Sequence, residues 1–131
     1  RRRVDDARVL GLSGDAVVRQ RLAAAYTQVQ LIRYSGLRTL ASLIDSGDPG
    51  PAASIAKMLW SQHHQSVAEL ALDLRGAQSL ITRSGDGYRP DRRQADFFGS
   101  RSSTIWGGTA EIQRNIVAER VLGLPREPET S

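Results

Sequence analysis

Apolar residues recur every three or four positions along much of the chain, a spacing typical of helices with one buried face. The first long stripe follows Asp15, a residue suited to an N-cap, and should run to about Ser46. Its members are Val18, Leu22, Ala25, Val29, Ile32, Gly36, Leu40 and Leu43. No stretch alternates apolar and polar residues for more than a few positions. The pattern therefore predicts an all-α fold.

A second stripe begins at Ala52 and is interrupted at Gly76. Its members are Ile55, Leu59, Val67, Leu70 and Leu74, broadened by Met58 and Trp60. Residues 45–51 are rich in turn formers, and Pro51 suits a first helical turn, where its missing N–H does no harm. We expect two long antiparallel helices joined by a short turn.

The remaining segments are shorter. We expect a brief helix in residues 1–14, as the stump of a longer one, and a solvent-exposed loop in residues 82–94. Further on, we expect a short helix near Phe97, Phe98 and Ile105, a last helix capped by Thr109 and ended by Gly123 and Pro125, and a frayed tail at 126–131. Residues 15–125 would then form one up-down helical bundle whose opening helix is largely missing, leaving apolar surface exposed.

Composition narrows the classes of protein. The 131 residues carry a net charge of +4, and Lys57 is the only lysine among eighteen basic residues. The arginines alternate with acidic residues and lack interleaved aromatics, which disfavours nucleic-acid binding; that reading would require salt-dependent binding to DNA or RNA. There is no cysteine, no apolar run of membrane-spanning length, and Asp5 and Asp6 interrupt any signal peptide after the opening arginines. Cytoplasm is the expected location.

Catalytic motifs are scarce. No nucleophile elbow, phosphate-binding loop or metal-ligand cluster occurs, and His63 and His64 point about 100° apart on a helix, so we expect a structural role for them. Gly107 and Gly108 before the Thr109 cap would let an anionic ligand approach the backbone, although they could also simply turn the chain. Glu111 likewise suits a first helical turn without any functional role.

The run from Ile105 to Pro125, IWGGTAEIQRNIVAERVLGLP, resembles the carboxy-terminal signature of acyl-CoA dehydrogenases. Residues 18–22 and 32–38 resemble the first long helix of that domain. Residues 57–61, with Gln65 and residues 69–72, resemble the next helix. The similarity extends in order over residues 16–125.

This resemblance implies an FAD-dependent enzyme that converts an acyl-CoA thioester to a trans-2-enoyl-CoA. In the family a carboxylate removes the α-proton, hydride passes to FAD, and an electron-transfer flavoprotein usually accepts the electrons. By position, Trp106 and Gly108 would contact substrate and Thr109, Ala110 and Glu111 would contact flavin. Gly76 matches a loop that reaches the flavin of a neighbouring subunit.

The sequence departs from the family at Gly107, where many members carry the glutamate base. Glycine cannot abstract a proton, so no catalytic residue is assigned. Some members supply the base from the opening helix, which would lie mostly before Arg1. We therefore expect the end of a longer dehydrogenase, inactive alone. The alternative is a non-catalytic helical subunit that completes a partner's flavin site; either would be a homo-oligomer or hetero-oligomer, and the acyl chain is left open.

Overall fold

A computed structural model describes residues 2–48, 52–82 and 89–126. Every regular element in these ranges is a helix, which confirms the predicted all-α class. The elements are α1 (Arg2–Val9), the 3-10 turn η1 (Leu12–Gly14), α2 (Ala16–Ser46), α3 (Ala52–Asp73), the 3-10 turn η2 (Gly76–Leu80), α4 (Arg92–Ser102) and α5 (Ala110–Arg120). None of the helices in the described ranges is long and apolar enough to cross a membrane.

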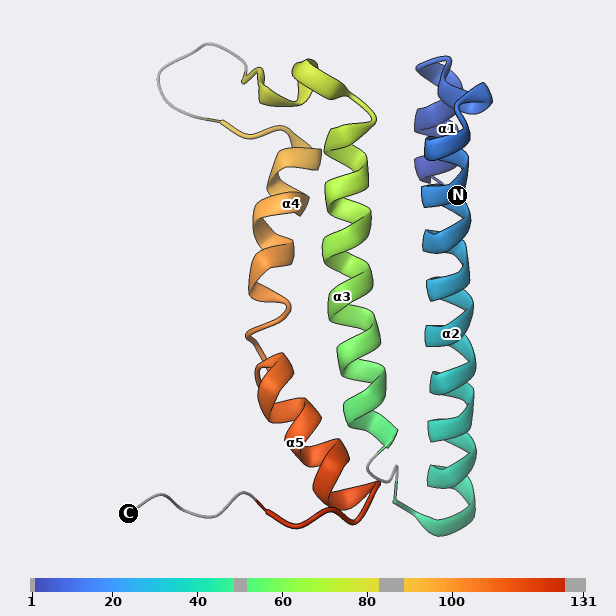
Figure 1. The fold of residues 1–131 in the computed structure, drawn as a ribbon, viewed down its shortest axis with the longest axis vertical. Coiled ribbons are helices and arrows are strands. Elements are labelled where there is room, and N and C mark those ends of the chain that lie inside the picture. Colours follow the sequence, from blue (N-terminus) through green and yellow to red (C-terminus); the bar gives the residue numbers. More distant parts are fainter. Residues whose placement is uncertain (1, 49–51, 83–88, 127–131) are drawn as a thin grey trace.

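Helix α3 is the centre of the arrangement. It runs antiparallel to α2 on one side, while α4 and α5 follow one another along its other side (Figure 1). The helix α3 packs against α1, α2, α4 and α5. The predicted pair of long antiparallel helices is thus present, and the short α1 occupies only one end of the α2–α3 pair.

The apolar core lies at the end where α1 meets the two long helices. Ala7, Leu70 and Leu74 are its buried members, at 1, 2 and 6 % exposure. The partly buried side chains around them are Leu12, Val18, Leu22 and Ala25. Asp6 joins α1 to α4 because its carboxylate accepts hydrogen bonds from Arg3 at 3.2 Å and from Arg93 at 2.6 Å. Burial would raise the pKa of Asp6, but these two guanidinium groups outweigh it and lower that pKa.

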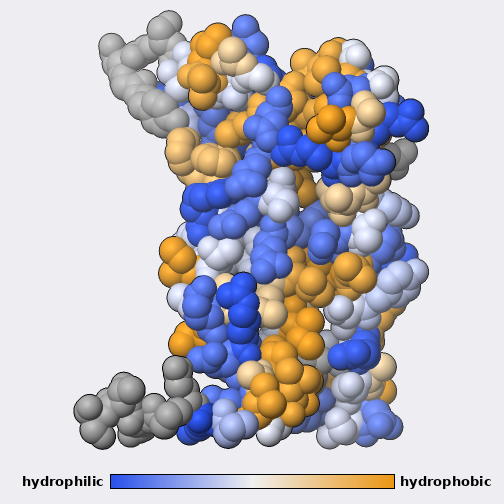
Figure 2. All heavy atoms as spheres, in the orientation of Figure 1, coloured by the Kyte–Doolittle hydropathy of each residue, from blue (hydrophilic) through white to orange (hydrophobic). Residues whose placement is uncertain are grey.

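Beyond α1 the first apolar stripe lies open. Val29, Leu40 and Leu43 are 44–50 % exposed, and Gly36 is exposed as well. Figure 2 shows hydrophobic atoms interrupting the hydrophilic surface at both ends and in the middle of one face. Each of these side chains keeps apolar area in water that a further helix would cover, at about 25 cal/mol per Å². The exposed apolar surface expected from the sequence is present, whereas the burial expected for this part of the stripe is wrong, because none of the helices in the described part of the chain covers it.

The helix ends agree with local sequence signals in most places. Asp15 caps α2 by accepting from the Val18 N–H at 2.9 Å, and Gly47 ends that helix with a φ of 73°. Thr109 caps α5, as expected, accepting from the Ile112 N–H. Pro51 and the tail from 127 lie outside the described residues.

The loop predicted for residues 82–94 is wrong at its last three residues. Helix α4 begins at Arg92 because Asp91 caps it, accepting from the backbone N–H groups of Arg93 and Gln94 at 2.8 and 2.9 Å. The Gln94 side chain accepts in return from the Asp91 N–H, and Gln94 is buried rather than exposed. Residues 83–88 of the predicted loop lie outside the described part.

Candidate functional site

The connection between α4 and α5 brings most of the predicted site residues together. Its first part is a turn in which the N–H groups of Ile105 and Trp106 both donate to the Ser102 carbonyl, at 3.0 and 2.9 Å. Gly107 and Gly108 follow with φ values of 70° and 95°, in the left-handed region that side-chain-bearing residues rarely adopt. Trp106, Gly108, Thr109, Ala110 and Glu111 are therefore neighbours, and we call residues 106–109 the glycine turn.

The carbonyl groups of the glycine turn are held by two side chains. Lys57, on α3, donates from Nζ to the Gly108 carbonyl. Gln113, on α5, donates from Nε2 to the Gly107 carbonyl at 2.8 Å and is itself only 7 % exposed. The turn is thus fixed from the protein side, through its carbonyl oxygens.

The φ of 95° favours glycine at residue 108, and the packing of Gln113 adds to this because its amide end would have to shift for a larger residue. A Cβ added there would lie 2.7 Å from Gln113 Nε2, closer than real contacts allow. At Gly107 the nearest atom to an added Cβ would be Lys57 Cε at 3.9 Å, an ordinary contact. The side of the turn at Gly107 is therefore open, and Gly107 itself is exposed.

Polar side chains of α3 hold the segment just before the turn. His64 Nδ1 lies 2.8 Å from the buried Ser103 hydroxyl, and Gln65 donates to the Thr104 hydroxyl at 3.1 Å. His64 also contacts the Trp60 ring, with 5.4 Å between centroids. The structural role expected for this histidine is present.

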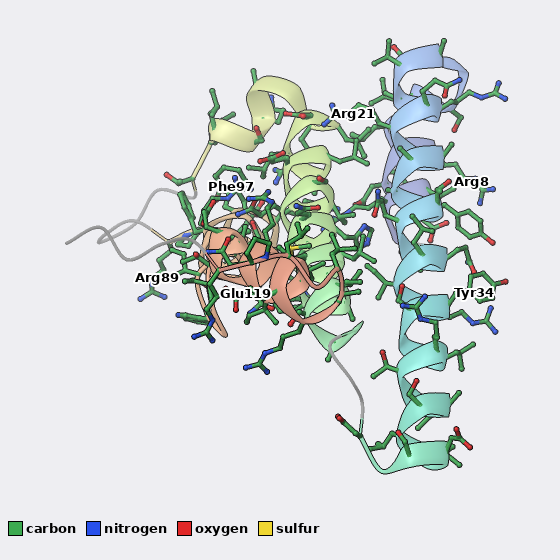
Figure 3. The ribbon with its side chains drawn as sticks, turned by 60° about the horizontal axis from the view of Figure 1, so that its bottom comes forward. Arg8, Arg21, Tyr34, Arg89, Phe97 and Glu119 are labelled. Atoms are coloured by element: carbon green, nitrogen blue, oxygen red, sulfur yellow. The ribbon has the colours of Figure 1, made fainter. Side chains whose placement is uncertain are left out.

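His63 faces a different environment. It lines a groove of about 310 Å³ between α2 and α3, together with Arg21 and Glu69. Its Nδ1 is buried without a hydrogen-bond partner among the described residues. Burial, and then the neighbouring His64, lower the His63 pKa, which favours the neutral imidazole. Figure 3 shows Arg21 between the two long helices, where it pairs with Asp73 at 2.6 Å.

Glu111 points away from any role as a base. Its side chain is 75 % exposed and lies 3.5 Å from Arg114 one turn further along α5. Its own backbone N–H, the Thr109 hydroxyl and Arg114 all lower the Glu111 pKa. A carboxylate with a lowered pKa is a weaker proton acceptor.

Gly76 lies apart from the other predicted residues. It begins η2, just after α3 ends at Asp73, whereas Lys57 and the glycine turn lie near the opposite end of α3. Sixteen residues of helix separate Lys57 from Asp73, which corresponds to about 24 Å. Within one copy of the chain, Gly76 and the glycine turn cannot contact the same small group.

Trp106 is the exposed aromatic residue of the turn. Its side chain is 73 % exposed, next to the open side of Gly107. The sequence predicted a role in the site for Trp106 but not for Lys57 or Gln113. The one signal that could have singled out Lys57 is that a lysine stands there in a chain otherwise rich in arginine.

Comparison with known proteins defines the class of protein. The family model described as "Acyl-CoA dehydrogenase, C-terminal domain" matches residues 2–122. The chain therefore belongs to the acyl-CoA dehydrogenase family, a family of oxidoreductases, and matches its carboxy-terminal helical domain.

Individual relatives carry the same family name. The chain is 40 % identical over 124 residues to the acyl-CoA dehydrogenase IpdE1 of Mycolicibacterium smegmatis, and 37 % identical over 130 residues to IpdE1 of Mycobacterium tuberculosis. These alignments cover 95 % of this chain but only 30 and 31 % of the relatives. A third relative, the M. tuberculosis acyl-CoA dehydrogenase FadE34, is 36 % identical over 90 residues, which are 68 % of this chain and 12 % of FadE34. No solved structure matches the chain.

Proposed function

We propose that the chain forms the carboxy-terminal helical wall of an FAD-dependent acyl-CoA dehydrogenase, with the glycine turn against flavin and thioester. The observation that carries this proposal is the open backbone of Gly107 beside the exposed Trp106, at the start of α5. In the proposed site Trp106 and Gly108 contact the acyl-CoA, and Thr109, Ala110 and Glu111 contact the flavin. Gly76 would reach the flavin of a neighbouring subunit.

The residues present fit such a ligand. Glycine backbone allows a flat ring to approach closely, and the free N–H groups of a helix start favour an electron-rich or anionic edge. A bound FAD would supply the acceptor for the β-hydrogen of the acyl group, which would leave as hydride while a base took the α-proton, and the product would be a trans-2-enoyl-CoA. The chain's own contribution is to line one side of the thioester, exclude water with Trp106 and keep the turn in place.

The proton acceptor is not part of this contribution. Gly107 has no side chain to take a proton, and Glu111 is turned toward Arg114. We therefore propose that the base comes from another part of the enzyme, that the chain by itself is inactive, and that an electron-transfer flavoprotein in the cytoplasm receives the electrons.

A dye-reduction assay tests this proposal. The purified chain with FAD and a series of acyl-CoA thioesters should reduce no dye. A hybrid enzyme can be made in which residues 2–126 replace the matching carboxy-terminal part of the M. smegmatis relative, which is 40 % identical there. This hybrid should form a flavin site. Dehydrogenation by the chain alone would overturn the proposal that its base lies elsewhere.

Gly107 also favours a second function, that of a non-catalytic subunit which completes the flavin site of a partner dehydrogenase. Such a subunit needs the turn but not the base. It should co-purify with a full-length dehydrogenase and raise that enzyme's flavin content. Recovery of the chain as a lone monomer from such a co-expression would argue against this function.

A further inference from the structure

We propose that Lys57 and Gln113 are positioning residues that together fix the peptide groups of the glycine turn, and that Lys57 is the member on which the turn's rigidity depends. This inference rests on the proposed function in one respect, since it assigns the turn's rigidity to the same flavin and thioester site. Neither residue touches a ligand in this account; both act through the turn.

The need for such a clamp follows from the backbone. Two consecutive glycines have more accessible conformations than any other pair of residues, so their order must come from outside the turn. Gly107 and Gly108 both have positive φ values, and neither amide N–H has a protein acceptor in the described part of the chain. Among the described residues, the hydrogen bonds that hold these two glycines are those to their carbonyl oxygens.

Lys57 and Gln113 donate to these two carbonyl groups from different helices. The Lys57 ammonium group reaches the Gly108 carbonyl from α3, fifty-one residues away in sequence, and the Gln113 amide reaches the Gly107 carbonyl from α5, six residues away. Gln113 follows the turn closely in sequence and lies on α5, so its hydrogen bond joins the turn to the helix that the turn precedes. Lys57 connects the turn to the central helix α3.

The charge of Lys57 makes its hydrogen bond the stronger of the two. A hydrogen bond with an ionised donor is roughly twice as strong as a neutral one. The Lys57 side chain is half-buried, and its stem passes under Gly107, with Cε 3.9 Å from the place where a Cβ would stand. The carbonyl oxygens are drawn toward the protein, which leaves the opposite side of the turn free for a ligand.

The clamp is tested on the 131-residue chain without any ligand. Backbone ¹⁵N relaxation gives an order parameter for each amide, about 0.85 where the backbone is rigid and below about 0.6 where it is flexible. In the unsubstituted chain, Gly107 and Gly108 should be as rigid as α3. Lys57→Met keeps the stem and removes the donor, so both glycines should become flexible while α3 and α5 stay rigid. Lys57→Arg, which keeps a cationic donor, should restore rigidity.

Two further readouts separate a positioning role from a merely structural one. The Gly108 carbonyl ¹³C resonance should shift in Lys57→Met and return in Lys57→Arg, and Gln113→Leu should loosen Gly107 more than Gly108. Unchanged order parameters in Lys57→Met, or a loss of order over the whole domain, would overturn the clamp. If the glycines loosen as expected but the hybrid carrying Lys57→Met keeps its flavin, the clamp stands and the placement of the flavin site at this turn is wrong.

Discussion

Lys57, near the start of α3, donates a hydrogen bond to the carbonyl of Gly108, and so joins the central helix to the turn that precedes α5. The stem of the same lysine passes Gly107, with Cε 3.9 Å from the place where a Cβ at residue 107 would stand.

A side chain placed at residue 107 should destabilise the chain through the backbone. Gly107→Glu puts a side chain on a backbone with φ of 70°, which costs about 1–2 kcal/mol of unfolding free energy in urea titrations. Gly107→Asn should cost less, since asparagine tolerates this conformation better. Equal losses for the two variants would contradict the backbone account.

The same Gly107→Glu variant should have a carboxyl pKa below the ordinary value of about 4.3, because the Lys57 ammonium lies beside it. A ¹³C-detected pH titration measures this pKa. Adding Lys57→Met should raise it again. A pKa that does not respond to Lys57→Met would show that the lysine faces elsewhere.

Two glycine-to-alanine changes should act in opposite directions. Gly108→Ala forces its Cβ to within 2.7 Å of Gln113 Nε2 on a backbone with φ of 95°, so it should lower the unfolding free energy by about 2 kcal/mol. Gly36→Ala, in the middle of α2 with nothing within 4 Å of the new Cβ, should raise it by about 0.5–1 kcal/mol. Chemical denaturation of both variants checks the signs, and a stabilising Gly108→Ala would refute the close packing against Gln113.

Acid should destabilise the chain partly through Asp91. Hydrogen bonding from the Gln94 backbone, and then from Arg75, lowers the Asp91 pKa in the folded state. A lowered folded pKa adds stability above the unfolded pKa of about 4, and this stability is lost as pH falls through the folded value. Asp91→Asn keeps a capping side chain but should flatten the fall in unfolding free energy below pH 4. Asp5→Asn, which removes an exposed carboxylate paired with Arg8, is the matched control. If the unfolding free energy of Asp91→Asn fell as steeply below pH 4 as that of the unsubstituted chain, the role of Asp91 would be contradicted.

The open side of α2 should make the chain associate. Tyr26, Leu37 and Ile44 are 66, 51 and 76 % exposed, and at 100° per residue they lie within about 20° of one another on the helix. Exposed apolar side chains that share one side of a helix tend to find a partner. Leu37→Glu should shift the chain toward monomer in sedimentation velocity at micromolar concentration. Val17→Glu adds the same charge on the opposite side of α2 and should leave association unchanged. Equal effects of the two variants would contradict association through the side of α2 that carries Leu37.

Local signals predicted much of the fold because they act within a few residues. The caps at Asp15 and Thr109 need only a side chain and an N–H three positions later, and both were recognised. The start of α4 has the same kind of local signal, because Asp91 and Gln94 form a capping box. It was not predicted because the charged and glycine-rich residues around it indicated a loop.

The candidate site was predictable only in part. Its position came from the glycines and from the family resemblance, whereas the residues that hold it come from long-range packing. The contact between Lys57 and Gly108 spans fifty-one residues, and the contact between His64 and Ser103 spans thirty-nine. Neither leaves a periodic pattern. The apolar spacing likewise did not predict that Val29 and Leu40 are exposed. Periodicity identifies an apolar face of a helix but not the element that covers it.

A flavin site at the glycine turn is tested by the FAD content of the purified hybrid, set against the same hybrid with Gly108→Ala. The hybrid with the unaltered turn should retain flavin, and Gly108→Ala should lose most of it while keeping its helical circular dichroism. A folded hybrid that lacks flavin, or one that keeps full flavin with Gly108→Ala, would contradict a flavin site at the glycine turn.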